Sequence, residues 1–312
     1  MQQPTNSTIL QTIGNTPLVK LSKIVPEHCA DIYVKLEYFN PTGSYKDRMA
    51  LAMVEEAEKR GDIKKGTTIV EYTGGSTGTS LAFICAVKGY HFKVICSDAF
   101  AKEKLKTMQL FGADLEIVAA EEGRITPSLF IKMEERVVQI VNDSGAYWTK
   151  QFHNEDALEG YKKMGNEILA ELPATIDVFC AGVGTAGMLT GVSRVLKANN
   201  KETKIVALEP ASSAFLSTGI KGSHRIEGMG TGAMPPLFSK QKSYDYVKAI
   251  DESDARKMAK LLASEEGIFA GTSSGLNIFA AIEIGKELGA GKTVVTVACD
   301  SGMKYLAGDL FD

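Results

Sequence analysis

The sequence has little of what marks several large classes of protein. Its 312 residues include four histidines, one tryptophan and five cysteines, and the formal net charge is only −3. The cysteines, at 29, 85, 96, 180 and 299, form no Cys-x-x-Cys pair, so a disulfide framework is not expected. There is no basic stripe, which argues against a nucleic-acid partner. No apolar run approaches the roughly 20 residues that a membrane helix needs.

Neither a targeting signal nor a metal site is expected. Residues 1–6 contain no charged region followed by an apolar core, so no secretory signal is expected. We expect the cysteines to be small buried residues in a reducing compartment, and the protein to be cytoplasmic. Asp98, Glu103 and the acidic run at 153–156 do not make a credible metal site. The acids after His153 are expected to begin a helix, where negative charge is favourable.

What is present is a repeated alternation of strand and helix patterns. This alternation predicts an α/β fold with mostly parallel, twisted sheets and helices on both faces, and the length suggests two domains. A boundary is expected near 145–153, and residues 221–240 are expected to form a long functional loop. The expected strands are 31–37, 67–71, 92–96, 114–118, 176–181, 204–209, 246–250 and 293–298. The main expected helices are 46–60, 78–88, 101–111, 126–142, 155–171, from the turn at 182–187 to about 198, 252–265 and 274–288.

One lysine follows a Pro/Gly turn at the start of an expected helix. Residues 40–48 read Asn-Pro-Thr-Gly-Ser-Tyr-Lys-Asp-Arg, which places Lys46 in the first helical turn. The partial positive charge of a helix N-terminus disfavours a second positive charge, so the neutral amine is favoured. A partly desolvated lysine of this kind is suited to attack an aldehyde. Lys46 is therefore a candidate nucleophile, although an isolated lysine at such a place is more often an ordinary solvated residue.

A glycine-rich motif lies between a later strand and helix. Residues 182–187 read Gly-Val-Gly-Thr-Ala-Gly, a literal G-x-G-x-x-G, and Glu209 ends the next strand, where a dinucleotide-binding fold has its ribose-binding acid. By itself this pattern favours an NAD-dependent dehydrogenase. Backbone N–H groups at a helix start bind any phosphate, however, so a single phosphate monoester suits the turn as well.

Two further glycine-rich turns carry hydroxyl groups. Residues 271–275, Gly-Thr-Ser-Ser-Gly, have the G-x-S-x-G pattern of a hydrolase, but its histidine must come later in the chain and all four histidines precede this turn. Residues 73–78, Thr-Gly-Gly-Ser-Thr-Gly, suit a carboxylate or a phosphate. A lysine amine, a phosphate-binding turn, an anion-binding turn and a serine at a helix start together match the needs of pyridoxal phosphate (PLP).

With these motifs in this order, the chain resembles the cysteine synthase (O-acetylserine sulfhydrylase) and cystathionine β-synthase family of fold-type-II PLP enzymes. The resemblance covers almost the whole chain, and residues 13–19, 40–48, 182–187, 266–275 and 300–306 carry it. It implies a fold like that of the tryptophan synthase β subunit. The implied smaller, mobile domain is 39–150, and the larger, PLP-binding domain is formed by 1–38 and 151–312. The dehydrogenase alternative leaves the lysine motif and residues 271–275 unexplained.

The resemblance also assigns roles to individual residues. It implies that Lys46 binds PLP covalently and acts as the catalytic base, and that Ser273 faces the pyridine nitrogen. The other implied cofactor contacts are Gly182, Gly184, Thr185, Ala186, Gly187, Met188 and Ser76. The implied substrate contacts are Thr73, Gly74, Gly75, Ser76, Thr77, Gln151 and Gly228.

The implied reaction is β-replacement on an O-activated serine through an α-aminoacrylate. O-acetylserine and sulfide, giving cysteine, are the expected substrates. A reaction like that of cystathionine β-synthase, another β-elimination, or the synthesis of a non-protein amino acid are alternatives within the family. A homodimer is the family's usual state, and the C-terminal tail of serine acetyltransferase is a candidate partner because some members bind it.

The chain departs from the family in two of its turns. The family usually has Thr-Ser-Gly-Asn-Thr where residues 73–77 read Thr-Gly-Gly-Ser-Thr, and Met188 replaces a threonine of the phosphate turn. Gly74 removes a hydroxyl group and is expected to leave room, and Ser76 is shorter than asparagine. We expect carboxylate binding to survive on Thr73, Thr77 and backbone N–H groups. We also expect weaker donor affinity, or a bulkier preferred donor or acceptor.

Overall fold

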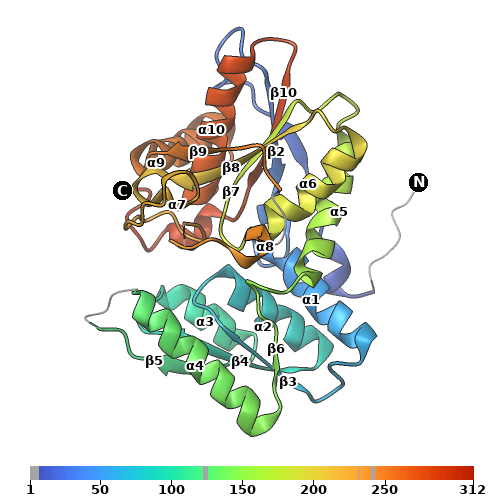
Figure 1. The fold of residues 1–312 in the computed structure, drawn as a ribbon, viewed down its shortest axis with the longest axis vertical. Coiled ribbons are helices and arrows are strands. Elements are labelled where there is room, and N and C mark those ends of the chain that lie inside the picture. The colour runs from blue at the N-terminus through green and yellow to red at the C-terminus, as the bar shows by residue number, and fades with distance from the viewer. Residues whose placement is uncertain (1–6, 122–125, 231, 240–242) are drawn as a thin grey trace. The chain divides into compact units, whose positions relative to one another are not determined.

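The computed structural model describes residues 7–121, 126–230, 232–239 and 243–312. The chain forms two compact units, each described by itself below (Figure 1). Unit 1 comprises Met1–Ile13 and Lys46–Ala157, and unit 2 comprises Gly14–Tyr45 and Leu158–Asp312. The mobile domain expected at 39–150 stays a prediction.

Unit 1 is a parallel sheet with helices on both faces. Its strand order is β5-β4-β3-β6. The chain first adds β4 and then β5 on one side of β3, and it then crosses back to add β6 on the other side of β3. Because such crossovers are right-handed, α2 and α3 lie on one face and α4 lies on the other. Figure 1 shows α4 running across the sheet. The elements are α1 (Lys46–Arg60), β3 (Thr68–Tyr72), α2 (Ser76–Lys88), β4 (His91–Ser97), α3 (Lys102–Leu110), β5 (Asp114–Val118), α4 (Pro127–Ser144) and β6 (Tyr147–Trp148).

The α4 face of this sheet shows how the sequence pattern builds the core. Leu129, Met133 and Val137 recur every four residues, which places them on one side of α4, where all three are buried. They pack with Val70 and Ile95 from the sheet. Each fully buried aliphatic side chain contributes about 1.5–3 kcal/mol of transfer free energy, so this stripe fixes α4 onto the sheet.

Unit 2 contains the larger sheet, in the order β1-β2-β10-β7-β8-β9. Among the strands that the structure describes in this sheet, β1 alone runs antiparallel, and the others are parallel to one another. Helix α10 packs against β10, β7 and β2, and α9 packs on α10. The elements are β1 (Leu18–Lys20), β2 (Asp31–Leu36), α5 (Asp156–Glu171), β7 (Val178–Gly182), α6 (Gly187–Asn199), β8 (Lys204–Pro210), α7 (Phe215–Thr218), α8 (Pro236–Ser239), β9 (Tyr246–Ile250), α9 (Glu252–Leu261), α10 (Thr272–Leu288) and β10 (Thr293–Ala298).

In each sheet, successive strands of the chain are first added on one side of a starting strand and later on its other side. The position between these two groups of strands is the point of reversal. In unit 1 this point lies between β3 and β6, and in unit 2 it lies between β7 and β10. Ligands of open parallel sheets bind outside the carboxyl ends of the strands at such points, because the loops diverge there and leave a crevice. The turn at 73–78 follows β3, and the turn at 182–187 follows β7. Both predicted anion-binding turns therefore lie where the topology favours a ligand.

The predicted α/β class with parallel sheets is confirmed, and several predicted boundaries are wrong. Helices α2 and α10 begin two residues earlier than expected, because Gly75 and Gly271 adopt extended backbones and end the preceding turns there. Helix α9 ends at Leu261 rather than 265, since a π-helical turn follows at Leu262–Glu266. The expected loop 221–240 contains the short helix α8, and residues 231 and 240 lie outside the described residues.

The cysteines and the apolar character of the helices were also considered in the sequence. The five cysteines are free thiols, of which four are buried and Cys29 is half-buried. Of the helices in the described ranges, none combines the length and the apolar character that crossing a membrane requires.

Candidate active site

The lysine motif forms the turn that the sequence predicted. The N–H of Gly43, whose φ is +70°, donates to the carbonyl of Asn40 at 2.7 Å, and the N–H of Tyr45 donates to the carbonyl of Cys299 at 3.0 Å. Lys46 is the next residue and begins α1, and it is only 8% exposed. An ammonium group loses hydration when it is buried, so the partly desolvated lysine expected from the sequence is found here.

The turn at 182–187 presents a set of backbone donors. Within the described ranges, the N–H groups of Gly184, Thr185, Ala186 and Met188 donate to no protein acceptor. Ala186 has φ +67°, a left-handed conformation that turns the chain into the start of α6. Buried or half-buried N–H groups almost always have a partner, so a cluster of unpaired ones at a helix N-terminus marks an anion site. The turn fits a phosphate.

Close packing requires the glycine at 184 and leaves little room at 187. A Cβ atom at Gly184 would lie 2.2 Å from the carbonyl oxygen of Gly228, and one at Gly187 would lie 3.3 Å from the Tyr161 ring. The structure therefore brings Gly228, predicted in the substrate site, next to the phosphate turn. A residue with a side chain fits at position 184 only if the backbone of Gly228 moves.

The start of α10 lies beside the same turn. The Gly182 N–H donates to Asn277 Oδ1 at 2.8 Å, and the Cys299 N–H donates to Ser274 Oγ at 2.9 Å. These bonds tie α10 to the carboxyl ends of β7 and β10, the two strands at the reversal point of this sheet. Asn277 holds this arrangement and was missed from the sequence, where a mid-helix asparagine gives little signal.

Ser273 precedes these anchors in the first turn of α10. It is 7% exposed, and no partner of its hydroxyl group is found in the part of the chain that the structure describes. Its side chain does not cap α10, because the residue at that position is Gly271 and no side-chain capping bond is made. A nearly buried hydroxyl group without a protein partner is suited to meet a polar atom of a ligand. The donor turn and this neutral hydroxyl together fit PLP.

In unit 1 the structure brings together the two segments predicted to bind the substrate. Thr77 Oγ1 donates to Gln151 Oε1 at 2.8 Å, and Gln151 Nε2 donates to the Tyr72 carbonyl at 3.2 Å. Within the turn, the Gly75 N–H donates to Thr73 Oγ1 at 3.2 Å. Gln151 follows β6 and the turn follows β3, so their proximity comes from the pairing of these two strands.

Glu71 organises these segments and was missed as a functional residue. It is fully buried, and its carboxylate accepts four hydrogen bonds, from Tyr72 N–H (2.9 Å), Trp148 Nε1 (3.1 Å), Thr149 Oγ1 (2.7 Å) and Gln151 N–H (3.0 Å). Burial raises the pKa of this carboxyl group, and the four hydrogen bonds oppose the rise. The sequence did contain a signal for this role, because Glu71 is the one charged residue of the mostly apolar strand β3.

Replacing Glu71 with glutamine is expected to lower the thermal unfolding midpoint. The new amide NH₂ group must face N–H or O–H donors, and each donor left unsatisfied costs about 1–3 kcal/mol. A raised pKa means that the native protein gains stability from Glu71 at low pH and loses it as pH rises through that pKa, whereas glutamine does not titrate. The deficit of the variant should therefore be larger at pH 5 than at pH 8. Glu103→Gln, on the exposed surface of α3, is the control, and an equal change in both variants would contradict the role of Glu71.

The expected room beside Gly74 is absent. A Cβ atom at this position would lie 2.0 Å from Cγ of Phe100, so the Phe100 ring fills the space that the sequence was expected to leave open. The sequence could not reveal this contact because Phe100 follows β4, a different strand. The expectation that Gly74 leaves room was wrong.

Glu209 does not behave as a ribose-binding acid. Its carboxylate accepts hydrogen bonds from the N–H groups of Leu216 (2.7 Å) and Ser217 (3.0 Å) and from the Ser217 hydroxyl (2.6 Å). These bonds occupy the carboxylate at the start of α7, where acids are favourable. Glu209, the acid that supported a dehydrogenase, is therefore explained by its hydrogen bonds to the start of α7.

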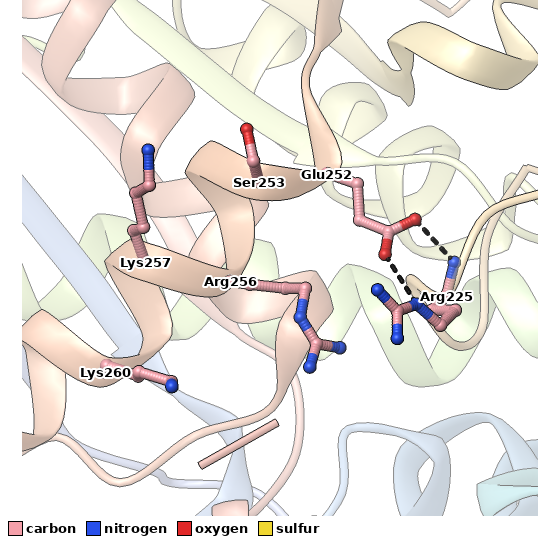
Figure 2. Close-up of a pocket in the computed structure, with 6 residues that line it drawn as sticks. All are labelled: Arg225, Glu252, Ser253, Arg256, Lys257 and Lys260. Carbon is pink, nitrogen blue, oxygen red and sulfur yellow. Dashed lines mark hydrogen bonds and ion pairs between the residues drawn. The ribbon is translucent and has the colours of Figure 1, made fainter. Parts of the chain in front are cut away.

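Figure 2 shows a charged pocket of unit 2, about 340 Å³ in volume. It contains none of the predicted site residues; its lining is Arg225, Glu252, Ser253, Arg256, Lys257 and Lys260. The Arg225 side chain pairs with Glu252 at 3.0 Å, and Arg256 pairs with Asp309 at 3.0 Å. Acidic groups thus compensate much of the positive charge, and the pocket is a surface ion-pair network.

The nearly buried Lys46, the donor turn at 182–187 and the nearly buried hydroxyl of Ser273 each fit a PLP enzyme. The chain belongs to the family described as pyridoxal-phosphate dependent enzyme, whose profile matches residues 9–300. It is 43% identical to the cysteine synthase of Staphylococcus aureus (strain N315), over 100% of this chain and 99% of that protein. It is 36% identical to the O-ureido-L-serine synthase of Streptomyces lavendulae, over 99% of this chain and 94% of that protein.

A solved structure agrees with these relatives. The cysteine synthase of Entamoeba histolytica superposes with a TM-score of 0.92 at 35% identity, and the match covers 100% of this chain and 93% of that one. The predicted family and the predicted cofactor are confirmed, and the chain is a PLP-dependent enzyme.

Proposed function

We propose that this enzyme makes cysteine from O-acetylserine and sulfide by β-replacement. The observation that carries the proposal is the nearly buried, neutral hydroxyl of Ser273, about one helical turn before Asn277, which binds the first residue of the donor turn at 182–187. The full-length similarity to a cysteine synthase supports the choice of substrates.

The proposed roles follow from the chemistry of each side chain. Lys46 would hold the cofactor covalently through its amine and, once released, take the α-proton of the substrate as general base. The N–H groups of residues 184–188 would bind the cofactor phosphate. When bound, PLP withdraws electrons from the α-carbon of an amino acid, which allows a β-substituent to leave. The hydroxyl of Ser273 would meet the pyridine nitrogen without a negative charge, so that nitrogen need not be protonated.

The turn at 73–77 and Gln151 would bind the substrate carboxylate. Charge-assisted hydrogen bonds to such a group are worth about 1.5–3 kcal/mol each. The Thr73 hydroxyl, the second N–H of the Gln151 amide and the first N–H groups of α2 would be the donors, because the Thr77 hydroxyl already donates to Gln151. The hydrogen bond between Thr77 and Gln151 orients both side chains before a ligand arrives. Such preorganisation lowers the cost of ordering them on binding.

The purified holoenzyme is expected to be yellow and to produce cysteine when O-acetylserine and sulfide are added. The amount of cysteine formed should equal the amount of acetate released, because each turnover breaks one C–O bond and forms one C–S bond. A control without sulfide separates replacement from simple elimination. Loss of donor without any cysteine would contradict the proposed β-replacement.

A second candidate function is the synthesis of another β-substituted alanine. Gly74 and Ser76 replace the serine and asparagine usual in the cysteine synthase turn, and one relative of the chain is an O-ureido-L-serine synthase. A panel of nucleophiles offered with O-acetylserine distinguishes the two candidates by which nucleophile gives the highest kcat/KM.

We also propose a cytoplasmic homodimer with a mobile smaller domain at 39–150. The usual state of the family supports the dimer and the domain movement, and the five free thiols are in keeping with a reducing compartment such as the cytoplasm. The C-terminal tail of serine acetyltransferase remains a candidate partner.

A further inference from the structure

Gly74 is a glycine because an aromatic ring occupies the place of its side chain. A Cβ atom there would lie 2.0 Å from Cγ, 2.1 Å from Cδ2 and 2.5 Å from Cδ1 of Phe100, well inside the roughly 3.4 Å of ordinary van der Waals contact. The backbone of Gly74 does not have the positive φ that favours glycine. Contact with the Phe100 ring, and not the backbone conformation, therefore excludes residues other than glycine from position 74.

The surroundings of Phe100 hold the ring in this position. Its N–H donates to the Ser97 carbonyl at 3.2 Å, in the turn that follows β4. The side chain is half-buried against the apolar cluster that contains Val70 and Ile95, and its ring centroid lies 6.4 Å from that of Phe130. A side chain packed in this way cannot swing away without losing apolar contact, so the ring is a fixed part of the turn's surroundings.

The ring changes the chemistry beside the turn. At position 74 a serine would present a hydroxyl group, a donor and acceptor, and the ring presents hydrocarbon in its place. Thr73, Thr77 and backbone N–H groups remain as polar contacts of the turn, and its flank at Gly74 is apolar. A group with carbon atoms gains contact with such a surface, and a small hydrated anion gains none.

We propose that Phe100 determines acceptor specificity, taking the place of a side chain at position 74 and favouring thiols with an apolar substituent over hydrosulfide. This inference rests on the proposed function, because it requires the turn at 73–77 to be part of the substrate site. In the reaction a thiol sulfur forms a bond to the β-carbon of O-acetylserine, the C–O bond to acetate breaks, and the thiol proton passes to solvent.

The test compares the wild type with Phe100→Ala, Gly74→Ser and the double variant, as holoenzymes. The first measurement is the ratio of kcat/KM for benzyl thiol to that for hydrosulfide, with O-acetylserine as donor. Phe100→Ala should lower this ratio by about tenfold, since a lost aromatic contact of about 1–1.5 kcal/mol corresponds to such a factor. Phe111→Ala, which removes a ring that packs on Phe83 and not on Phe100, should keep the ratio of the wild type.

The second measurement tests the steric pairing without turnover. Gly74→Ser should lower the thermal unfolding midpoint. It should also weaken O-acetylserine binding, which is measured through the change in cofactor absorbance. The double variant should recover both, because removal of the ring makes room for the serine. Additive effects of the two substitutions would overturn the pairing. An unchanged thiol ratio in Phe100→Ala would overturn the specificity role.

These outcomes are separable from failure of the proposed function. Suppose that the wild type shows the absorbance of bound PLP but gives no replacement product from O-acetylserine, whichever nucleophile is added. The proposed function then fails, and the specificity role fails with it. The unfolding midpoints would in that case still decide whether Phe100 excludes a side chain at position 74. If the wild type is active and the ratio does not respond to Phe100→Ala, only the specificity role is lost.

Discussion

Lys46→Ala is expected to abolish turnover and to leave no cofactor that borohydride can fix to the protein. The first residue of α1 carries the amine that we propose to hold the cofactor, and alanine can neither bind an aldehyde nor accept the α-proton. Removal of a group that acts in both binding and catalysis has one of the largest effects that a single substitution can have.

The measurement is reduction of the holoenzyme with borohydride, followed by mapping of the labelled peptide, together with a turnover assay. The matched control is Lys59→Ala, which changes a lysine at the other end of the same helix whose side chain is 67% exposed. Label in the peptide that contains Lys46 in the wild type, and its loss in Lys46→Ala alone, is the expected pattern. Label at a different lysine would contradict the assignment.

Gly184→Ala is expected to weaken PLP binding by on the order of ten- to a hundredfold. The added methyl group would lie 2.2 Å from the carbonyl oxygen of Gly228, so one of the two backbone segments must move. Overpacking of this kind costs about 1–3 kcal/mol, and every 1.4 kcal/mol corresponds to a factor of ten in affinity. The movement also displaces the N–H groups that are proposed to hold the phosphate.

The affinity is measured by titrating the apoenzyme with PLP and following absorbance or tryptophan fluorescence. Gly308→Ala is the control, since the nearest atom to its added methyl group is 3.5 Å away, which is ordinary contact. If Gly184→Ala binds PLP as tightly as the control, the turn at 182–187 is not the phosphate site. A parallel titration with NAD, which should not bind, is a control for the specificity of the turn.

Much of the fold and part of the site follow from the sequence because they depend on local rules. Helix periodicity predicted α1 with the bounds that the structure has, and the strands at 114–118, 246–250 and 293–298 agree as well. A Pro/Gly turn before a helix placed Lys46, and a strand followed by glycines placed the turn at 182–187. The predicted boundaries failed mainly at glycines and at the end of α9, where one residue's backbone decides where a helix starts or stops.

The sequence by itself determined which chemical groups this protein has and in which turns they lie, since a turn is formed by residues adjacent in the chain. Only the tertiary structure decided which turns become neighbours. Strand order places Gln151 beside Thr77, with Glu71 buried between the segments, and it places Gly228 against Gly184. It also sets Phe100 on Gly74, where the sequence suggested open space. Such contacts depend on strand pairing and packing, and no local pattern encodes the distance between residues on different strands.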